Sequence, residues 1–270
     1  MSLPRTAHLL ALFLVVMVGS AAAQETIESP YTTSWLREGL LIGGGVANGI
    51  VASSFNDTVS AITIAELSAL DRNSINGFDR FAAGNYSPTA SHVSDYMLAA
   101  SLLSPFGLII ADGRIRQDWD KISVMYLETI LWSALLPSYT KGTVQRIRPF
   151  AYNTETPLEE REEPETRRSF FSGHASLTFS SAVFLAKVYS DYYPDSDYKP
   201  YVWGGSLAVA GTIGYLRVHA GAHFPTDVLV GAIVGSAVGY LIPMLHATGT
   251  DKDDASLMIF PGGVMLGYRF

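Results

Sequence analysis

Residues 217–227 read Arg-Val-His-Ala-Gly-Ala-His-Phe-Pro-Thr-Asp and join two long apolar stretches of the chain. The sequence has six such stretches, each of 17 to 22 residues. They lie at 39–55, 93–111, 122–139, 170–189, 202–219 and 225–246. A helix of this length crosses about 30 Å of hydrocarbon, and none of the stretches keeps the alternation of a strand. The sequence therefore predicts an all-α fold, a membrane-embedded bundle of about six hydrophobic helices.

The composition excludes several classes of protein. Of the 270 residues, 48% are hydrophobic and only 16% are charged, below the roughly 25% of an ordinary soluble domain. The net charge is −7 and there is no basic run, so nucleic acid is not an expected partner. The absence of cysteine excludes disulfides, thiolate chemistry and cysteine-ligated zinc.

Some stretches are imperfect membrane spans, so a soluble helical bundle is the alternative. The stretch 39–55 is rich in glycine, and Glu128 lies near the middle of the third stretch. We interpret Glu128 as a buried structural partner of a cation. Gly231, Gly235 and Gly239 follow one another at steps of four, a small-residue stripe that lets helices approach closely.

The chain divides into three parts. Residues 1–23 are typical of a secretory signal peptide, because Arg5 precedes an apolar segment and small residues at 20–23. We expect cleavage before Gln24, and an uncleaved N-terminal anchor is the alternative. Residues 24–246 form the helical domain. Residues 247–270 form a C-terminal tail, in which two short strands around Pro261 predict a β-hairpin-like end.

Three clusters of polar residues carry the chemistry. The first contains Lys141 and Arg148; the second is Ser172-Gly173-His174; the third contains Arg217, His223 and Asp227. Each cluster lies at the end of an apolar stretch. If consecutive helices are antiparallel neighbours, all three clusters meet at one end of the bundle.

These residue types suit the transfer of a phosphoryl group. Arginine and lysine side chains bind phosphoryl oxygens, and Ser172-Gly173 at a helix start offers backbone N–H groups to an anion. Asp227 follows His223 by four residues, so its carboxylate can accept from one ring nitrogen and leave the other free to attack. His174 can protonate a leaving oxygen. This predicts covalent transfer through a phosphohistidine, without a metal or a cofactor.

The ordered triple of clusters resembles the signature of the type-2 phosphatidic acid phosphatase and vanadium haloperoxidase superfamily, in its membrane lipid phosphatase branch. The resemblance covers roughly residues 94–243. It implies that Lys141, Arg148 and Arg217, with Ser172 and Gly173, bind the phosphoryl group. It also implies that His223 is the nucleophile, oriented by Asp227, and that His174 is the general acid. Phe171 and Leu216 depart from the family pattern, which usually has Pro and Ser there.

The remaining histidines and arginines have simpler interpretations. We expect His219 to line the pocket. It lies four residues before His223, so a two-histidine metal site is an alternative, but no third ligand is well placed. We expect His92 and His246 to be polar boundary residues. The remaining arginines of the polar loops are interpreted as solvated charges; they are Arg146, Arg161, Arg167 and Arg168.

The expected activity is a phosphatase acting on phosphate or pyrophosphate groups of membrane lipids. A soluble periplasmic acid phosphatase and a vanadium-dependent haloperoxidase are the alternatives. The expected location is a bacterial cell envelope. Arg114, Arg116 and Lys121 lie in a loop opposite the site, and the excess of positive charge in cytoplasmic loops therefore favours a site that faces the periplasm.

Overall fold

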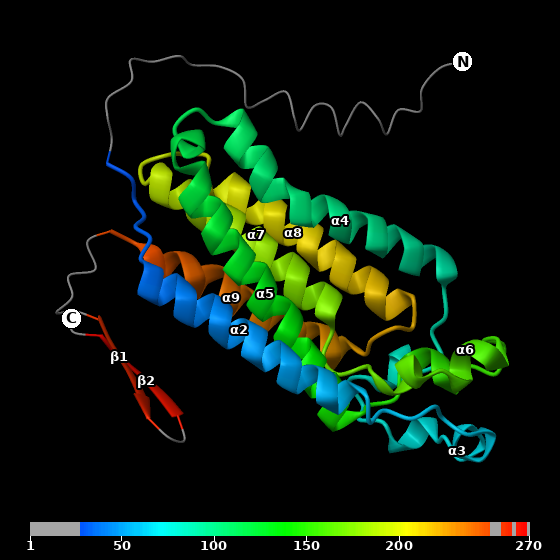
Figure 1. Ribbon diagram of the computed structural model, residues 1–270. Helices are drawn as coiled ribbons and strands as arrows, with labels where there is room; N and C mark the ends of the chain where they lie inside the picture. The colour runs from blue at the N-terminus through cyan, green and yellow to red at the C-terminus, as the bar shows by residue number, and fades with distance from the viewer. Residues whose placement is uncertain (1–27, 249–254, 261–262, 269–270) are drawn as a thin grey trace, which may run out of the picture.

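A computed structural model of the protein describes residues 28–248, 255–260 and 263–268. The predicted signal peptide at 1–23 lies outside these residues. Six helices of 20 to 26 residues form the body of the described part (Figure 1). They are α2 (Trp35–Asn56), α4 (Pro88–Ala111), α5 (Trp119–Val144), α7 (Gly173–Tyr192), α8 (Lys199–His219) and α9 (Pro225–His246). The predicted helical bundle is confirmed, and each apolar stretch falls on one of these helices, except that residues 170–172 precede α7.

Shorter elements connect the long helices. They are α3 (Ile64–Ser68), η1 (Arg72–Ser74), η2 (Arg80–Ala82), η3 (Ile115–Asp118), η4 (Pro149–Tyr152), α6 (Leu158–Glu162) and η5 (Pro164–Arg167). After α9, strands β1 (Ala255–Phe260) and β2 (Gly263–Tyr268) pair antiparallel, with Ala255 opposite Tyr268. In Figure 1 these strands lie away from α3 and α6, toward the other end of the bundle.

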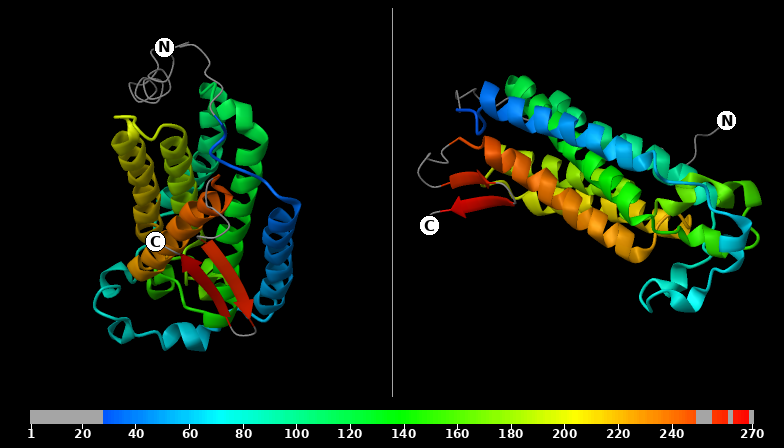
Figure 2. Two further views of the ribbon diagram at one scale, coloured as in Figure 1. Left: turned by 90° about the vertical axis from the view of Figure 1, so that its left-hand side faces the viewer. Right: turned by 60° about the horizontal axis from the view of Figure 1, so that its bottom comes forward.

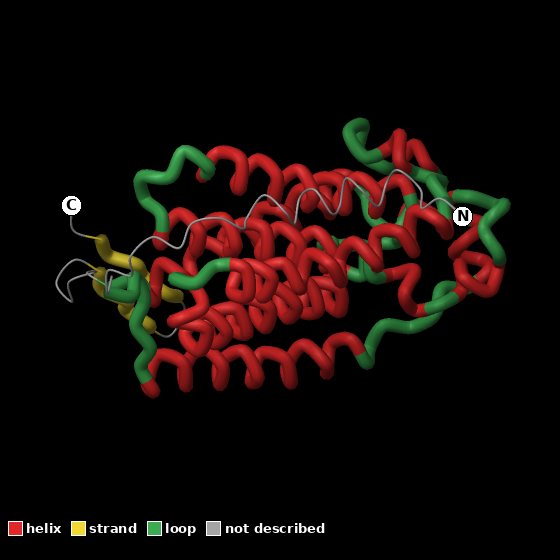
Figure 3. Tube along the Cα trace, turned by 90° about the horizontal axis from the view of Figure 1, so that it is seen from above, coloured by secondary structure: helices red, strands yellow, loops and turns green. Residues whose placement is uncertain are grey.

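The long helices run side by side, with their connections gathered at the two ends (Figure 3). Helix α7 is the centre of the bundle and packs against α4, α5, α8 and α9. Helix α2 runs along the outside beside α5 (Figures 1 and 2). At one end of the bundle, here called the site end, two hydrogen bonds join the ends of neighbouring helices. Ser172 N, before α7, donates to Asp227 O of α9 at 3.0 Å, and Ser87 N, before α4, donates to Ala220 O, after α8, at 3.4 Å. We call the opposite end, where α2 begins and α9 finishes, the far end.

The glycine stripe brings α9 against α7. A Cβ at Gly231 would lie 2.6 Å from the carbonyl oxygen of Ser172, closer than real Cβ contacts. Gly235 and Gly239 meet the carbonyl oxygens of Ser176 and Ser180 in the same way. The predicted close approach is confirmed, and it sets the start of α7 beside the start of α9.

The interior of the bundle contains many polar side chains, and its outer face contains many apolar ones. Buried hydroxyl side chains line the contacts between helices: Ser94, Ser101, Thr129, Ser133, Ser176, Thr178, Ser180 and Ser181. Large apolar side chains are exposed on the outside, among them Leu40, Leu103, Ile110, Leu229 and Ile233. Helices α4 and α9 are long and apolar enough to cross a membrane. Because small polar residues hold helices together in lipid, this distribution favours a membrane bundle over a soluble one.

Candidate active site

The structure gathers the three predicted clusters at the site end. Lys141 lies in the last turn of α5 and Arg148 in the following loop, while Ser172 and Gly173 begin α7. Arg217 lies in the last turn of α8, and Asp227 in the first turn of α9. Ser172 is the N-cap, and its hydroxyl accepts from Ala175 N at 3.2 Å, as expected of a helix start.

A sharp turn between α8 and α9 presents His223. Gly221 has a φ of 76°, and a Cβ there would overlap the carbonyl group of Asn85. Glycine adopts this left-handed conformation without steric cost. Its carbonyl oxygen accepts from Phe150 N at 3.0 Å, which ties the turn to the loop that carries Arg148.

His223 is buried, with 1% of its surface exposed. Its Nδ1 lies 2.6 Å from the carbonyl oxygen of Ser169. A carbonyl only accepts, so Nδ1 carries the proton and Nε2 keeps a free lone pair. The predicted hydrogen bond to Asp227 is absent, because Oδ2 of that residue lies 4.0 Å from Nδ1.

Asp227 instead organises the backbone around His223. Its Oδ2 accepts from the Ser169 hydroxyl at 2.5 Å and from Phe224 N at 2.8 Å. Its Oδ1 accepts from Arg146 at 2.5 Å. The carboxylate of Asp227 therefore caps the start of α9, where it accepts from a free backbone N–H group. It does not bond directly to the His223 imidazole.

Arg146 is part of this arrangement, so its interpretation as a solvated loop charge is wrong. It pairs with Asp227 and, at 2.7 Å, with Asp79, and both carboxylates are fully buried. Asp79 also accepts from Thr226 N at 3.0 Å and from the Thr226 hydroxyl at 2.6 Å. The loop that follows α3 is therefore anchored to the start of α9. The sequence offers little indication of this role, apart from the position of Arg146 two residues before Arg148 in the same loop.

His174 and Arg217 share one carboxylate on α4. Asp95 Oδ1 lies 2.7 Å from His174 Nε2 and 3.3 Å from Arg217 Nη1. The same guanidinium donates to Ser91 at 3.2 Å and to Ser94 at 3.1 Å. Sequence reasoning missed Asp95, although polar residues at 91, 94 and 95 in an apolar helix mark one polar face.

Two arginines of the site have buried N–H groups that make no hydrogen bond within the described part of the chain. Arg148 pairs with Glu165 at 2.9 Å, but its buried Nε has no hydrogen-bond partner among the described residues. The buried Nε of Arg217 is likewise unpartnered within the described part of the chain. Buried donors normally have partners. An anion bound between Arg148 and Arg217 would supply the missing hydrogen-bond acceptors.

The electrostatics favour an uncharged imidazole beside an anion site. Burial, followed by the positive charge of Arg148, lowers the pKa of His223 well below its ordinary value of 6.5. Arg217 and Lys141 act in the same direction. Burial raises the pKa of Glu165, but Arg148 and Arg168 outweigh it and hold that carboxyl below its usual range. His223 is thus neutral and able to attack at neutral pH.

Some of the other histidines and arginines differ from their predicted surroundings. His219 stacks on Tyr215, with ring centroids 6.1 Å apart, and no metal-ligand group in the described residues includes it. His246 is fully buried, so its interpretation as a boundary residue is wrong, whereas His92 is exposed. Arg167 pairs with Glu66 at 2.6 Å, and Arg168 with Glu165 at 2.6 Å. Loop arginines of this kind find partners because the loops fold over one another.

The chain is similar in sequence to known proteins. Residues 123–250 match the family model described as PAP2 superfamily. A protein named phosphatidylglycerophosphatase B from Bacillus subtilis is 30% identical over 53% of this chain and 68% of its own length. The chain belongs to the PAP2 superfamily. This confirms the family expected from the three clusters.

Two other relatives of the chain carry different names. A protein of Sulfolobus acidocaldarius named undecaprenyl-diphosphatase is 27% identical over 49% of this chain and 59% of its own length. A lipid A 4'-phosphatase from Porphyromonas gingivalis is 30% identical over 45% of this chain and 49% of its own length. The alignments therefore cover between about half and two thirds of the length of the three relatives.

Proposed function

We propose that this PAP2 protein is a phosphatase that hydrolyses phosphomonoester or pyrophosphate groups of membrane lipids through a phosphohistidine. The observation that carries the proposal is the His223 imidazole. Its Nδ1 proton is held by a backbone carbonyl, and three cations act on it from close by. A neutral nucleophile beside unpartnered guanidinium groups suits attack on a phosphate dianion.

The reaction has two steps. Lys141, Arg148 and Arg217 hold the phosphoryl oxygens, with the backbone N–H groups at Ser172-Gly173. The Nε2 lone pair of His223 forms a bond to phosphorus as the bond to the leaving oxygen breaks. His174 enters this step as an imidazolium, protonated on both ring nitrogens; the leaving oxygen takes its Nε2 proton and leaves a neutral imidazole. Water then attacks phosphorus, gives a proton back to His174, and the P–N bond breaks to release phosphate. No metal takes part in these steps.

Two carboxylates support the histidines. Asp227 is a positioning residue, because it reaches His223 only through Ser169 and the backbone at Phe224. Asp95 keeps a proton on Nε2 of His174, since a carboxylate at 2.7 Å accepts only from a protonated nitrogen. When substrate binds, this proton is available to the leaving oxygen.

A lipid substrate fits the surroundings of the site. The outer face of the helices is apolar, and two large exposed side chains, Phe78 and Phe81, flank the inward-facing Asp79 at the site end. Exposed aromatic residues at this level suit a membrane interface. The names of all three relatives refer to lipids or lipid carriers. The head group stays open among phosphatidate, phosphatidylglycerophosphate, a polyprenyl pyrophosphate and a lipid A phosphate.

We further propose that the site faces the periplasm, on the strength of Arg114, Arg116 and Lys121 at the far end. Helix α2 begins at the far end and lies along α5. If α2 crosses the membrane, a cleaved signal peptide would place the site in the cytoplasm. The two expectations, signal cleavage and a periplasmic site, are therefore compatible only if α2 does not cross.

Cysteine labelling tests the orientation, since the chain has no cysteine of its own. Gln117→Cys places a thiol at the far end, and Glu155→Cys places one at the site end, both at exposed positions. A membrane-impermeant maleimide applied to spheroplasts should label only position 155. Labelling of position 117 alone would reverse the orientation.

Phosphate release from a panel of lipid phosphates tests the function. Wild type should release phosphate, His223→Ala should lose activity by at least about 10³-fold, and the exposed control His92→Gln should retain it. Acid quenching should trap a phosphorylated wild-type protein but not the His223 variant. Efficient cleavage of small phosphomonoesters by protein extracted with salt alone would point to a soluble acid phosphatase. Halide oxidation with vanadate and peroxide, without phosphatase activity, would point to a haloperoxidase.

A further inference from the structure

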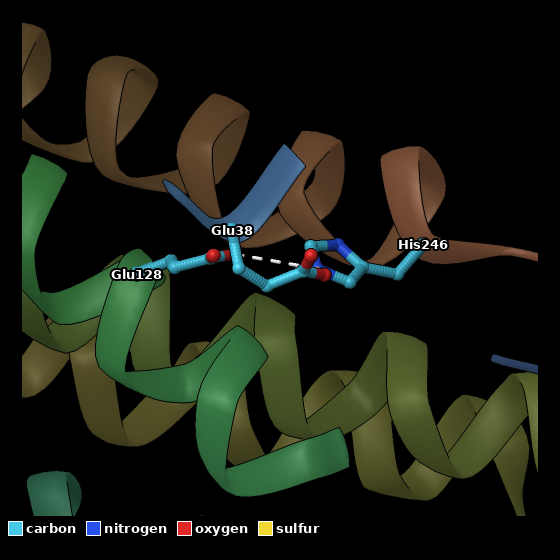
Figure 4. Close-up of side chains that lie close together, drawn as sticks. All are labelled: Glu38, Glu128 and His246. Atoms are coloured by element: carbon cyan, nitrogen blue, oxygen red, sulfur yellow. Dashed lines mark ion pairs between the residues drawn. The ribbon is translucent and has the colours of Figure 1, made fainter. Parts of the chain in front are cut away.

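Three ionisable side chains from three helices meet near the far end of the bundle, away from the candidate active site (Figure 4). They are Glu38 of α2, Glu128 of α5 and His246 of α9. One ligand atom from each lies within 4.8 Å of the others. We call these residues the Glu-Glu-His cluster.

The cluster contains buried polar atoms without hydrogen-bond partners. Glu128 is fully buried, and neither of its carboxylate oxygens has a partner among the described residues. The Nε2 atom of His246 is also fully buried, and it makes no hydrogen bond in the described part of the chain. A buried carboxylate in this state is strongly destabilising unless a cation or a proton satisfies it.

The orientation of His246 is that of a metal ligand. Its Nδ1 lies 2.8 Å from the carbonyl oxygen of Ile242, so Nδ1 carries a proton and Nε2 faces the carboxylates, where a neutral imidazole would offer its lone pair to a cation. A hydrogen bond from the second ring nitrogen to a backbone carbonyl fixes metal-bound histidines in this way. The Nε2 atom lies 3.1 Å from Glu38 Oε1 and 3.4 Å from Glu128 Oε2, yet it is not aligned with either oxygen for a hydrogen bond.

The two separations that involve His246 Nε2 are close to the edge of a coordination tetrahedron. Ligands at about 2.0–2.1 Å from Zn²⁺ lie about 3.3–3.4 Å from one another. Arg37 balances the charge of Glu38 through a contact of 2.8 Å, whereas no lysine or arginine among the described residues pairs with Glu128. We propose that Glu38, Glu128 and His246 bind a divalent transition-metal ion, with Zn²⁺ the best match to this ligand set and geometry.

This extends the interpretation of Glu128 as the partner of a cation, and it replaces the sequence-based expectation that the chain has no metal site. The ion would be structural, because the cluster is buried and distant from the phosphoryl chemistry. It would fasten α2, which packs mainly on α5, to the end of α9. Backbone bonds converge on the same place: Thr32 N donates to His246 O, and Thr248 N to Pro30 O, each at 2.8 Å.

Metal content tests the proposal directly. The full chain, purified in detergent without a histidine tag, is loaded with Zn²⁺, dialysed against metal-free buffer and analysed by mass spectrometry. Wild type should retain about one zinc ion per chain. Glu128→Gln and His246→Gln should each retain at least about tenfold less, while the exposed controls His92→Gln and Glu155→Gln should match wild type.

A second measurement needs no variant. Chelation should lower the Tm of wild-type protein by about 5 °C, and added Zn²⁺ should restore it. Co²⁺ in place of Zn²⁺ should give the visible absorption bands of a tetrahedral site. Wild type that retains no zinc and shows no change in Tm would overturn the proposal, because the cluster would then be held together by protons. Equal retention by wild type and both cluster variants would overturn it as well.

Discussion

The Nδ1 atom of His223 lies 2.6 Å from the carbonyl oxygen of Ser169, whereas the nearest oxygen of Asp227 lies 4.0 Å away. Ser169 connects the other two residues. Its carbonyl accepts from the imidazole, and its hydroxyl donates to Asp227 at 2.5 Å. The carboxylate therefore orients the nucleophile through a serine that lies outside the three sequence clusters.

The first prediction concerns this serine. Ser169→Ala keeps the carbonyl but leaves the buried Asp227 oxygen with one donor fewer, which costs about 1–3 kcal/mol. We expect kcat to fall about tenfold with KM little changed, and Ser169→Thr to restore most of it. The control Ser104→Ala removes a hydroxyl that bonds only to Ser101 O within its own helix. A Ser169→Ala enzyme with wild-type kcat would show that the link through Ser169 has no role in turnover.

The second prediction is a pH dependence of stability. Burial, together with Arg148, holds the pKa of His223 well below 6.5 in the folded protein, whereas the unfolded chain titrates near 6.5. Below pH 6.5 the unfolded state thus binds a proton that the folded state does not, and stability falls as the pH falls. The drop in Tm from pH 7.5 to pH 5.0 should be larger for wild type than for His223→Gln. Equal drops in the two proteins would contradict the depressed pKa.

The bundle was predictable because the length of an apolar stretch can be read from the local sequence alone. The six stretches and the glycine stripe at 231, 235 and 239 could be recognised without any contact information. The meeting of the three clusters followed from antiparallel connectivity alone.

Residues that act across the fold were not predictable in this way. Three such residues contact partners that lie far away in the sequence: Asp79, Asp95 and Ser169. Their local sequence does not indicate which residue each of them contacts. His246 is a further case, because a histidine at the end of an apolar stretch looks like a boundary residue. Only the packing of α2 and α5 around it buries it.

The third prediction tests the contact between α7 and α9. Gly235→Ala would place a Cβ against the carbonyl group of Ser176, where backbone atoms cannot move aside cheaply. We expect a loss of at least about 2 kcal/mol in the free energy of unfolding. The control Gly211→Ala adds a methyl group where no atom lies within 4 Å, so it should be neutral or slightly stabilising. Denaturation of both variants in the same detergent makes the comparison, and similar stabilities would argue against the close helix contact.

The fourth prediction separates the acid from the nucleophile. An aryl phosphate has a leaving group that departs without a proton, so His174→Ala should lose much less activity on it than on a lipid phosphate. His223→Ala should lose activity on both substrates. Asp95→Asn should resemble a milder His174 variant, since its carboxylate contacts that imidazole at 2.7 Å. Equal losses on both substrates for His174→Ala would argue against an acid role.

The fifth prediction concerns Arg146, which joins two fully buried carboxylates although 24% of its own side chain is exposed. Arg146→Met keeps the apolar stem but leaves Asp79 and Asp227 without a cation. Breaking such a pair costs about 3 kcal/mol when it is fully buried, and we expect about 2 kcal/mol here because solvent reaches the guanidinium. A double-mutant cycle with Asp79→Asn should show coupling of at least about 1 kcal/mol, because the asparagine no longer needs the positive charge. Additive losses in the cycle would mean that Arg146 and Asp79 stabilise the site end independently, and the link between the loop after α3 and the start of α9 would then rest on Thr226 alone.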